Sequence, residues 1–176
     1  MGSASQPMEG RVAVTSALAV ANFLLDQAKA EGRPIRQLKL QKLIYFCYAW
    51  YAGNKGEELF SEDIEAWQFG PVVREVYLEF KDAGASPITH RATAMDWEAF
   101  DLVEPELPSE LAEELRPVWD IYKAKSDAWL VEATHAASEP WGILVKKVGH
   151  ADKRQIPFEL IKSVYTKKVE QIGASG

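Results

Sequence analysis

The sequence has one cysteine, Cys47, and three histidines, His90, His135 and His150. A single cysteine cannot form a disulfide within the chain, so nothing in the sequence requires an oxidising compartment. A structural zinc site usually takes four Cys or His ligands, and this chain has few of either. Cys47 lies in an apolar run, which predicts a small core residue and not a reactive thiol.

The sequence also lacks the short motifs that mark common catalytic and nucleotide-binding sites. It contains no GxSxG, no GxxxxGK[ST], no HExxH and no paired CxxC. The acidic stretch "GEELFSED" (56–63) lacks the alternating ligands and central glycine of a calcium loop. We therefore expect a protein that is not an enzyme, with no catalytic residues, no metal and no cofactor.

A long hydrophobic run is missing as well. The apolar part of residues 11–25 is too short to span a bilayer, which takes about 20 residues. The stretch has no clear basic segment before it, and Asn22 interrupts it. An amphipathic first helix, capped by Thr15 or Ser16, is the better interpretation. We expect a cytoplasmic protein with no membrane partner.

Positive charge is in short supply. The net charge is −6, which makes nucleic acid an unlikely partner, although residues 142–176 hold seven basic and three acidic groups. DNA binding through this basic segment is the weakest hypothesis. Between Asp96 and Glu114 there are eight carboxylates and no lysine or arginine. A solvated connector and helix face is the favoured interpretation, and a docking surface for a basic partner is the alternative.

The length of 176 residues suits one domain. The pattern predicts a mainly α fold: a single compact helical domain of about six or seven helices, with two or three short strands inserted after the second helix. The second helix, from near Gln37, is apolar on all sides over residues 43–52, which indicates the centre of a bundle. We expect a flexible N-terminus (1–10), one domain (11–170) and a flexible C-terminus (171–176).

Prolines and short alternations predict the remaining local structure. "EDIEAW" (62–67) alternates as a half-buried strand does, and "SPITH" (86–90) is its candidate partner. Pro71 fits the first turn of the helix that follows. A capping signal at Ser109 predicts a helix start, and Pro117 should kink or restart that helix. Pro140 and Pro157 are expected to open the last two helices.

His135 attracts attention first as a candidate for chemistry. On an ideal helix it lies opposite the apolar side, near Glu132. A structural role is favoured, because a lone histidine lacks the other members of a catalytic group. Four aromatic residues are candidates to border a groove for a partner: Trp50, Tyr51, Trp67 and Trp119.

Three stretches taken together point to a family. "LKLQKLIYFCYAW" (38–50), "IEAWQFGPVVREVY" (64–77) and "LVEATHAASEPW" (130–141) resemble the three signature blocks of the Panacea domain. This is the SocA-like antitoxin family, also called GepA-like. The order and spacing agree, and the resemblance extends over about residues 15–165. It implies a compact, mainly helical fold with a small β element.

The resemblance also implies a function. It implies an antitoxin that binds a cognate toxin protein and neutralises it, either directly or as a proteolytic adaptor that delivers the toxin to the ClpXP protease, with ClpX and ClpP as further partners. His135, Pro140 and Trp141 would then join two helices, with Trp141 packed beside "WQFGPV". The candidate partner-binding or fold-signature residues are Lys42, Tyr45, Trp50, Trp67, Gly70, Pro71, Val72, His135, Pro140 and Trp141, with Leu40 and Leu43 also matching the motif.

An alternative from another class stays open. An enzyme or a small-ligand or metal-binding protein would use His135 with Glu139 and nearby carboxylates. The family pattern often has an acidic residue two positions after the histidine. Here that position is Ala137, which weakens a pairing of His135 with a carboxylate.

Overall fold

The computed structural model describes residues 13–175, and the predicted flexible segment 1–10 lies outside them. The described residues form seven α-helices and two small antiparallel strand pairs, so the predicted mainly α fold with a β element after the second helix is confirmed. The elements are α1 (Ala17–Ala30), α2 (Gln37–Lys55), β1 (Glu65–Trp67), β2 (Gly70–Val72), α3 (Arg74–Phe80), a 3-10 turn (Lys81–Ala83), β3 (Ala94–Asp96), β4 (Asp101–Val103), α4 (Ser109–Tyr122), α5 (Asp127–His135), α6 (Pro140–Val148) and α7 (Phe158–Ala174).

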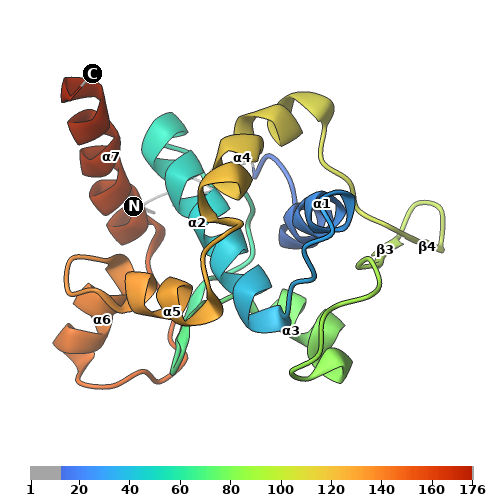
Figure 1. Cartoon of the computed structure of the whole chain (residues 1–176), viewed down its shortest axis with the longest axis horizontal. Coiled ribbons are helices and arrows are strands. Elements are labelled where there is room, and N and C mark those ends of the chain that lie inside the picture. Colours follow the sequence, from blue (N-terminus) through green and yellow to red (C-terminus); the bar gives the residue numbers. More distant parts are fainter. Residues whose placement is uncertain (1–12, 176) are drawn as a thin grey trace, which may run out of the picture.

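Helix α2 forms the centre of the molecule. In Figure 1 it runs between α7 on one side and α1 and α4 on the other, and it contacts all three. Leu43, Ile44, Cys47 and Ala49 are fully buried in it. Burial raises the pKa of the Cys47 thiol, as expected of a core cysteine. The prediction of a helix apolar on all sides at the centre of a bundle is confirmed.

Helix starts follow the local signals in the sequence. The Ser16 hydroxyl accepts a hydrogen bond of 3.2 Å from the Ala19 amide and so caps α1. Pro140 is in the first turn of α6, and Pro157 immediately precedes α7. These starts are as predicted because capping depends on residues a few positions apart.

The β element differs from the prediction in its partner. Strand β1 pairs with β2, with Glu65 opposite Val72 and Trp67 opposite Gly70. Pro71 therefore lies in a strand, and the prediction that it opens a helix was wrong. Two residues connect the strands, and Gly70 takes a φ of 109°, which a side chain would disfavour. This turn reverses the chain, so that β2 pairs with β1 directly and β1 takes its strand partner from the next segment of the sequence.

Residues 86–90 do not pair with β1, and that prediction was also wrong. The Ile88 amide donates instead to the Ile35 carbonyl at 2.9 Å, just before α2. The open edge of β1 is covered by the segment before α7, where the Ile156 amide donates to the Ile64 carbonyl at 2.7 Å. Both pairings join segments far apart in the sequence.

Helix α4 begins at Ser109 as predicted, but without the predicted cap. Ser109 is its first helical residue and caps nothing; the residue before the helix is Pro108. The helix passes through Pro117 without a restart. Its inner face of Leu111, Leu115 and Val118 is buried, and this packing holds the helix together although Pro117 has no amide to donate.

Candidate functional site

The three signature blocks, from α2, from the β1–β2 pair and from the α5–α6 junction, meet at one place. Lys42 of α2 is fully buried, and its ammonium nitrogen donates to the Pro71 carbonyl of β2 at 3.1 Å. Burial lowers the pKa of Lys42 to about 7. A lysine that is this easily neutralised fits a structural donor in a low-dielectric site, and it would also suit proton transfer.

Gly70 permits this close packing. A Cβ added at Gly70 would lie 2.8 Å from Cε of Lys42 and 2.8 Å from Oγ1 of Thr134. Thr134 comes from α5 and is fully buried. The absence of a side chain at Gly70 therefore lets α2, β2 and α5 touch at a single point.

Trp141 joins the third block to the second. Its indole nitrogen donates to the Trp67 carbonyl at 2.8 Å, which is the contact with "WQFGPV" that the sequence predicted. Gly142 follows in α6, and a Cβ there would lie 2.1 Å from the Ala136 carbonyl oxygen. The backbones of α6 and of the residue after α5 therefore pack so closely that only glycine fits at position 142.

His135 packs flat against Trp141. The two ring centroids are 3.8 Å apart and the planes differ by 5°. Its Nε2 is buried without a hydrogen-bond partner. The pKa of His135 is lowered, first by burial and then by the positive charge of Lys42. The neutral ring is therefore favoured, which suits stacking at the junction.

Glu139 does not serve His135 as a base or orienting group. It is buried, one of its oxygens accepts a hydrogen bond of 2.9 Å from the Tyr165 hydroxyl, and the other forms an ion pair with Lys168. Both partners belong to α7. Glu139 therefore ties the α5–α6 junction to the last helix, and the pairing assumed by the enzyme hypothesis is not formed in this structure.

Gln41 is a member of this cluster that the sequence analysis missed. Its side-chain amide donates to the Val73 carbonyl at 3.2 Å and its carbonyl accepts from the Val73 amide at 2.9 Å. Thr134 was missed as well. The available signal was the pair of polar residues, Gln41 and Lys42, at the start of an otherwise apolar buried helix.

The remaining predicted residues lie around or apart from this cluster. Trp50 is half-buried and donates to the Tyr122 hydroxyl at 2.9 Å. Tyr45 is buried, with its ring nearly perpendicular to that of Tyr165. Trp119 is only 1% exposed, so the prediction that it borders a groove was wrong. Its indole nitrogen donates to the carboxylate of Glu31, the residue that follows α1.

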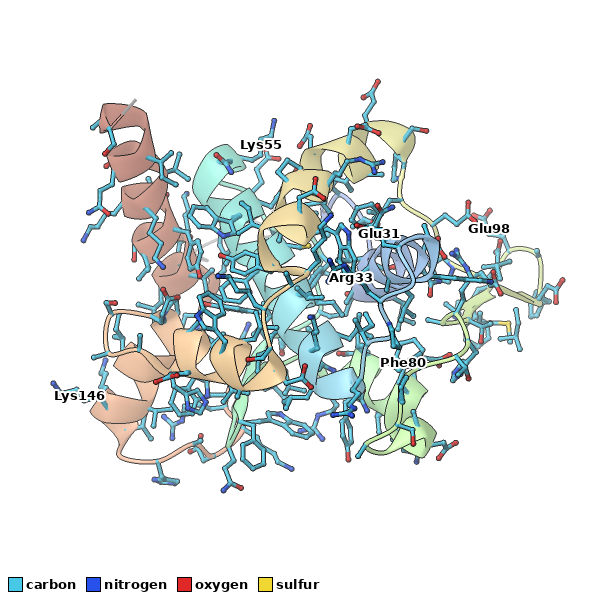
Figure 2. All side chains as sticks on the ribbon, viewed as in Figure 1. Glu31, Arg33, Lys55, Phe80, Glu98 and Lys146 are labelled. Carbon is cyan, nitrogen blue, oxygen red and sulfur yellow. The ribbon has the colours of Figure 1, made fainter. Side chains whose placement is uncertain are left out.

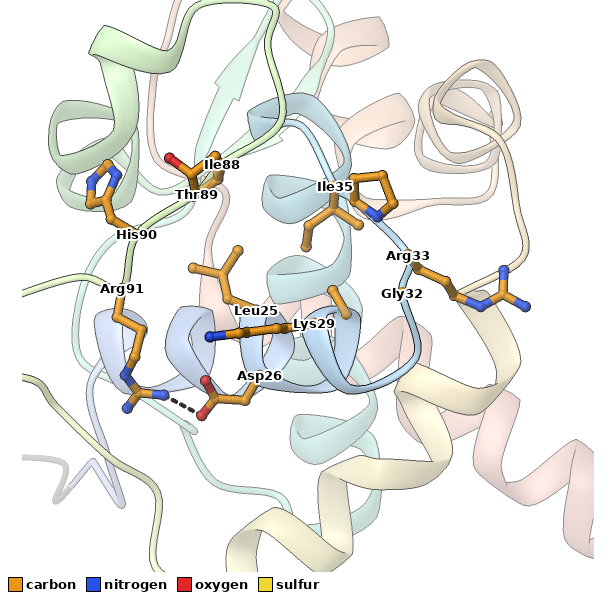
Figure 3. A pocket seen from close by; sticks show the side chains of 12 residues that line it. Leu25, Asp26, Lys29, Gly32, Arg33, Ile35, Ile88, Thr89, His90 and Arg91 are labelled. Atoms are coloured by element: carbon orange, nitrogen blue, oxygen red, sulfur yellow. Dashed lines mark hydrogen bonds and ion pairs between the residues drawn. The ribbon is translucent and has the colours of Figure 1, made fainter.

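Three of the cavities on the surface of the described residues bear on the predicted site residues or on charged groups. One of about 410 Å³ adjoins the cluster and is lined by Lys42, Trp67 and Val72 among others. A second, of about 510 Å³, is lined by Trp50 and Tyr51. The third, of about 440 Å³, lies between α1 and residues 88–91, where Asp26 and Arg91 form an ion pair (Figure 3).

Two features are absent from the described residues, a group of side chains that could bind a metal ion and a helix that could span a membrane. Nowhere in residues 13–175 do three or more His, Cys, Asp or Glu side chains come together in a way that could hold a metal ion. No helix in the same part of the chain is both long and apolar enough to cross a membrane.

Comparisons with known proteins cover all three blocks. The family model described as "Antitoxin SocA-like, Panacea domain" matches residues 40–142, which include the cluster from Lys42 to Trp141. The chain is 36% identical over 135 residues to Antitoxin SocA of Caulobacter vibrioides, covering 76% of this chain and 72% of that protein. No solved structure matches the chain. This chain belongs to the SocA-like antitoxin family, with a Panacea domain.

Proposed function

We propose that this protein is an antitoxin that acts by binding: it holds a cognate toxin protein and neutralises it. The observation that carries the proposal is the 36% identity with an antitoxin over 135 residues. The matched family region spans all three blocks of the buried cluster. In this proposal the buried cluster holds the scaffold, and the scaffold presents the surface that binds the toxin.

The use of the polar groups in the cluster supports binding over catalysis. Lys42 donates to the Pro71 carbonyl, and Gln41 forms two hydrogen bonds with Val73. Glu139 is occupied by Tyr165 and Lys168. The hydrogen bonds of these side chains connect elements of the fold, so the side chains have a structural role.

Neutralisation takes one of two forms. In the first, the complex itself blocks the toxin. In the second, the protein is a proteolytic adaptor and hands the toxin to the ClpXP protease. Either form acts where the toxin is made, so we propose the cytoplasm as its location. The two forms differ in one observable, the half-life of the toxin.

The test uses the products of the genes that flank this one. Each is expressed alone in a bacterial host to find one that arrests growth, and then together with this protein. The proposal expects restored growth and a stable complex of the two purified proteins. Pulse-chase measurement of the toxin with and without ClpP then separates the forms: a half-life shortened only when ClpP is present identifies an adaptor.

A His135→Ala variant distinguishes binding from the enzyme alternative. If the protein acts by binding, a folded variant that still forms the complex also still restores growth. A variant that folds and binds normally but no longer protects the cell would contradict the proposal. Failure of the wild-type protein to bind or counteract any flanking product would also overturn it.

A further inference from the structure

The hairpin of β3 and β4 carries an unusual share of the exposed apolar surface. Of the thirteen large hydrophobic side chains that are exposed in the described residues, five lie between positions 95 and 103. Trp97 and Phe100 at the turn are 73% and 81% exposed. The others are Met95, Leu102 and Val103. Figure 1 shows the hairpin at the end of the molecule opposite α7.

Four of these side chains lie on one face of the strand pair or at its turn, whereas Val103, next to Leu102, lies on the opposite face. Met95 pairs directly with Leu102 across the two strands, and cross-strand partners lie on the same face of a hairpin. Trp97 and Phe100 begin and end the four-residue connection between β3 and β4. Clustered exposed apolar residues, unlike scattered ones, mark interaction sites, and tryptophan is prominent among binding hot spots.

A buried asparagine fixes the base of the hairpin. Asn22 of α1 is fully buried, and its amide donates to the carbonyl of Ala92 at 3.0 Å and to that of Pro105 at 2.9 Å. Its carbonyl accepts from the Ala92 amide at 2.7 Å. Residues 92 and 105 precede and follow the hairpin, so one side chain holds both arms.

Arg91 strengthens the same base with ion pairs. Its guanidinium contacts Asp26 of α1, Glu104 at 2.8 Å and Glu106 at 3.4 Å. Each of these exposed pairs contributes little alone, but together they connect α1 to the chain before β3 and after β4. The hairpin is thereby held to the body although its own strands bury little, and holding an interface in place beforehand lowers the entropic cost of binding.

The turn is held in a conformation that its residues do not favour. Phe100 has a φ of 52°, a left-handed conformation that glycine or asparagine adopts more readily. The Asp96 carboxylate accepts hydrogen bonds from the amides of Glu98 and Ala99 at 2.9 and 3.1 Å and so shapes the turn. An exposed phenylalanine in a strained turn adds nothing to the core, which points to a function for its ring.

Charge indicates what kind of partner fits. Residues 94–106 contain five carboxylates and no lysine or arginine. Two of them, Glu104 and Glu106, contact Arg91. Asp96, Glu98 and Asp101 remain around the turn, and Figure 2 shows Glu98 at the outer end of the hairpin. An apolar tip among carboxylates is complementary to an apolar cleft with a basic rim.

We propose that the β3–β4 hairpin is the element by which this protein grips its toxin, and that the toxin presents an apolar cleft rimmed by lysine or arginine. The inference rests on the proposed function. A second copy of this chain fits less well. The basic segment 142–176 includes α7, at the opposite end of the molecule from the hairpin, so the contact would join unlike surfaces and build open chains of copies.

The test measures binding of the growth-arresting flanking product to hairpin variants. A Trp97→Ala, Phe100→Ala double variant is compared with Ile121→Ala, Ile172→Ala, which removes side chains that are 59% and 63% exposed elsewhere. Both should keep the wild-type thermal unfolding midpoint within a few degrees. We expect the hairpin variant to bind at least about thirtyfold more weakly and to lose protection of growth, with the control unchanged.

A charge reversal tests the partner chemistry separately. Glu98→Lys should slow association several-fold at low salt, and the difference should shrink as salt is added. Glu170→Lys, an exposed position in α7, is the control and should leave the rate unchanged.

The outcomes separate the two proposals. If the wild-type protein binds the toxin and the hairpin variant binds it equally well, the hairpin inference is overturned and the antitoxin proposal stands. If the wild-type protein binds and counteracts no flanking product, both fall. If the double variant loses only self-association of the free chain, measured by light scattering, the hairpin is a contact between copies and the inference is wrong.

Discussion

Trp141 donates its indole N–H to the backbone carbonyl of Trp67, 2.8 Å away, and so binds the α5–α6 junction to the β1–β2 pair. The two residues are 74 positions apart in the sequence. The ring of Trp141 also stacks on the ring of His135. A single side chain therefore joins the second and third signature blocks.

Trp141→Phe should remove the hydrogen bond while keeping much of the ring contact. We expect the free energy of unfolding to fall by about 1–3 kcal/mol, because the Trp67 carbonyl loses its donor. Trp129→Phe is the matched control, since Trp129 is 41% exposed, and it should change stability by less than about 0.5 kcal/mol. Urea unfolding measures both variants. Equal losses of unfolding free energy would show that the hydrogen bond to the Trp67 carbonyl does not stabilise the fold.

Gly70→Ala should be strongly destabilising for two reasons that can be separated. The new Cβ meets Lys42 and Thr134 at 2.8 Å, and the φ of 109° disfavours a side chain. Gly32→Ala introduces only the backbone penalty, because nothing lies within 4 Å of its Cβ at a φ of 62°. We expect about 1 kcal/mol for Gly32→Ala and at least about 3 kcal/mol for Gly70→Ala by the same unfolding assay. Similar losses in both would argue against tight packing at Gly70.

Lys42 should make stability rise with pH just above neutrality. Its pKa is about 7 in the folded protein and near its ordinary value of 10.5 when unfolded, so the unfolded chain binds more protons between these values. The free energy of unfolding should then increase by about 1–2 kcal/mol from pH 7.0 to 8.5, since one pKa unit corresponds to about 1.4 kcal/mol. Lys42→Met should abolish this increase, and Lys29→Met, at an exposed position of α1, should keep it.

The pH window is chosen to exclude two other groups. The lowered pKa of His135 affects stability only below about pH 6.5, where the unfolded histidine gains its proton. The raised pKa of Cys47 lowers stability only above about pH 8.5, where the unfolded thiol ionises. If the Lys42→Met protein still gains as much stability from pH 7.0 to 8.5, another group causes the increase and its assignment to Lys42 is wrong.

Asn22→Ala should loosen the hairpin base. It leaves the Ala92 amide and two carbonyls without their partner, and we expect a loss of about 2–4 kcal/mol. Asn54→Ala is the control, because Asn54 makes only an exposed bond to the Trp50 carbonyl and should matter by less than about 1 kcal/mol. Hydrogen exchange gives the local readout: the Ala92 amide should exchange faster in the Asn22 variant. Unchanged protection there would show that Asn22 does not hold the arms.

Much of the fold could be predicted because its signals are local. The Ser16 cap, the prolines at α6 and α7 and the apolar run of α2 each depend on residues within a few turns of one another. The pairing of strands failed for the opposite reason. Whether β1 takes its neighbour β2 or residues 86–90 depends on which segments pack nearby, and a three-residue strand carries too little pattern to decide.

Burial and proximity were likewise decided by the tertiary structure. Trp50 and Trp119 look equally able to border a groove in the sequence, but α1 packs over Trp119 and leaves Trp50 half-buried. The exposed aromatic tip of the β3–β4 hairpin was not predicted, because the acidic residues around it favoured a solvated connector and suggested a docking surface only as the alternative.

The sequence by itself determined most of the helices and the three blocks that resemble an antitoxin family. Only the tertiary structure decided that Lys42, Gly70 and Thr134 meet at one buried point, and that Asn22 holds a hairpin seventy residues away. The reason is physical: helix formation and capping are short-range interactions, whereas a buried donor takes whichever acceptor the packing of distant elements brings within reach.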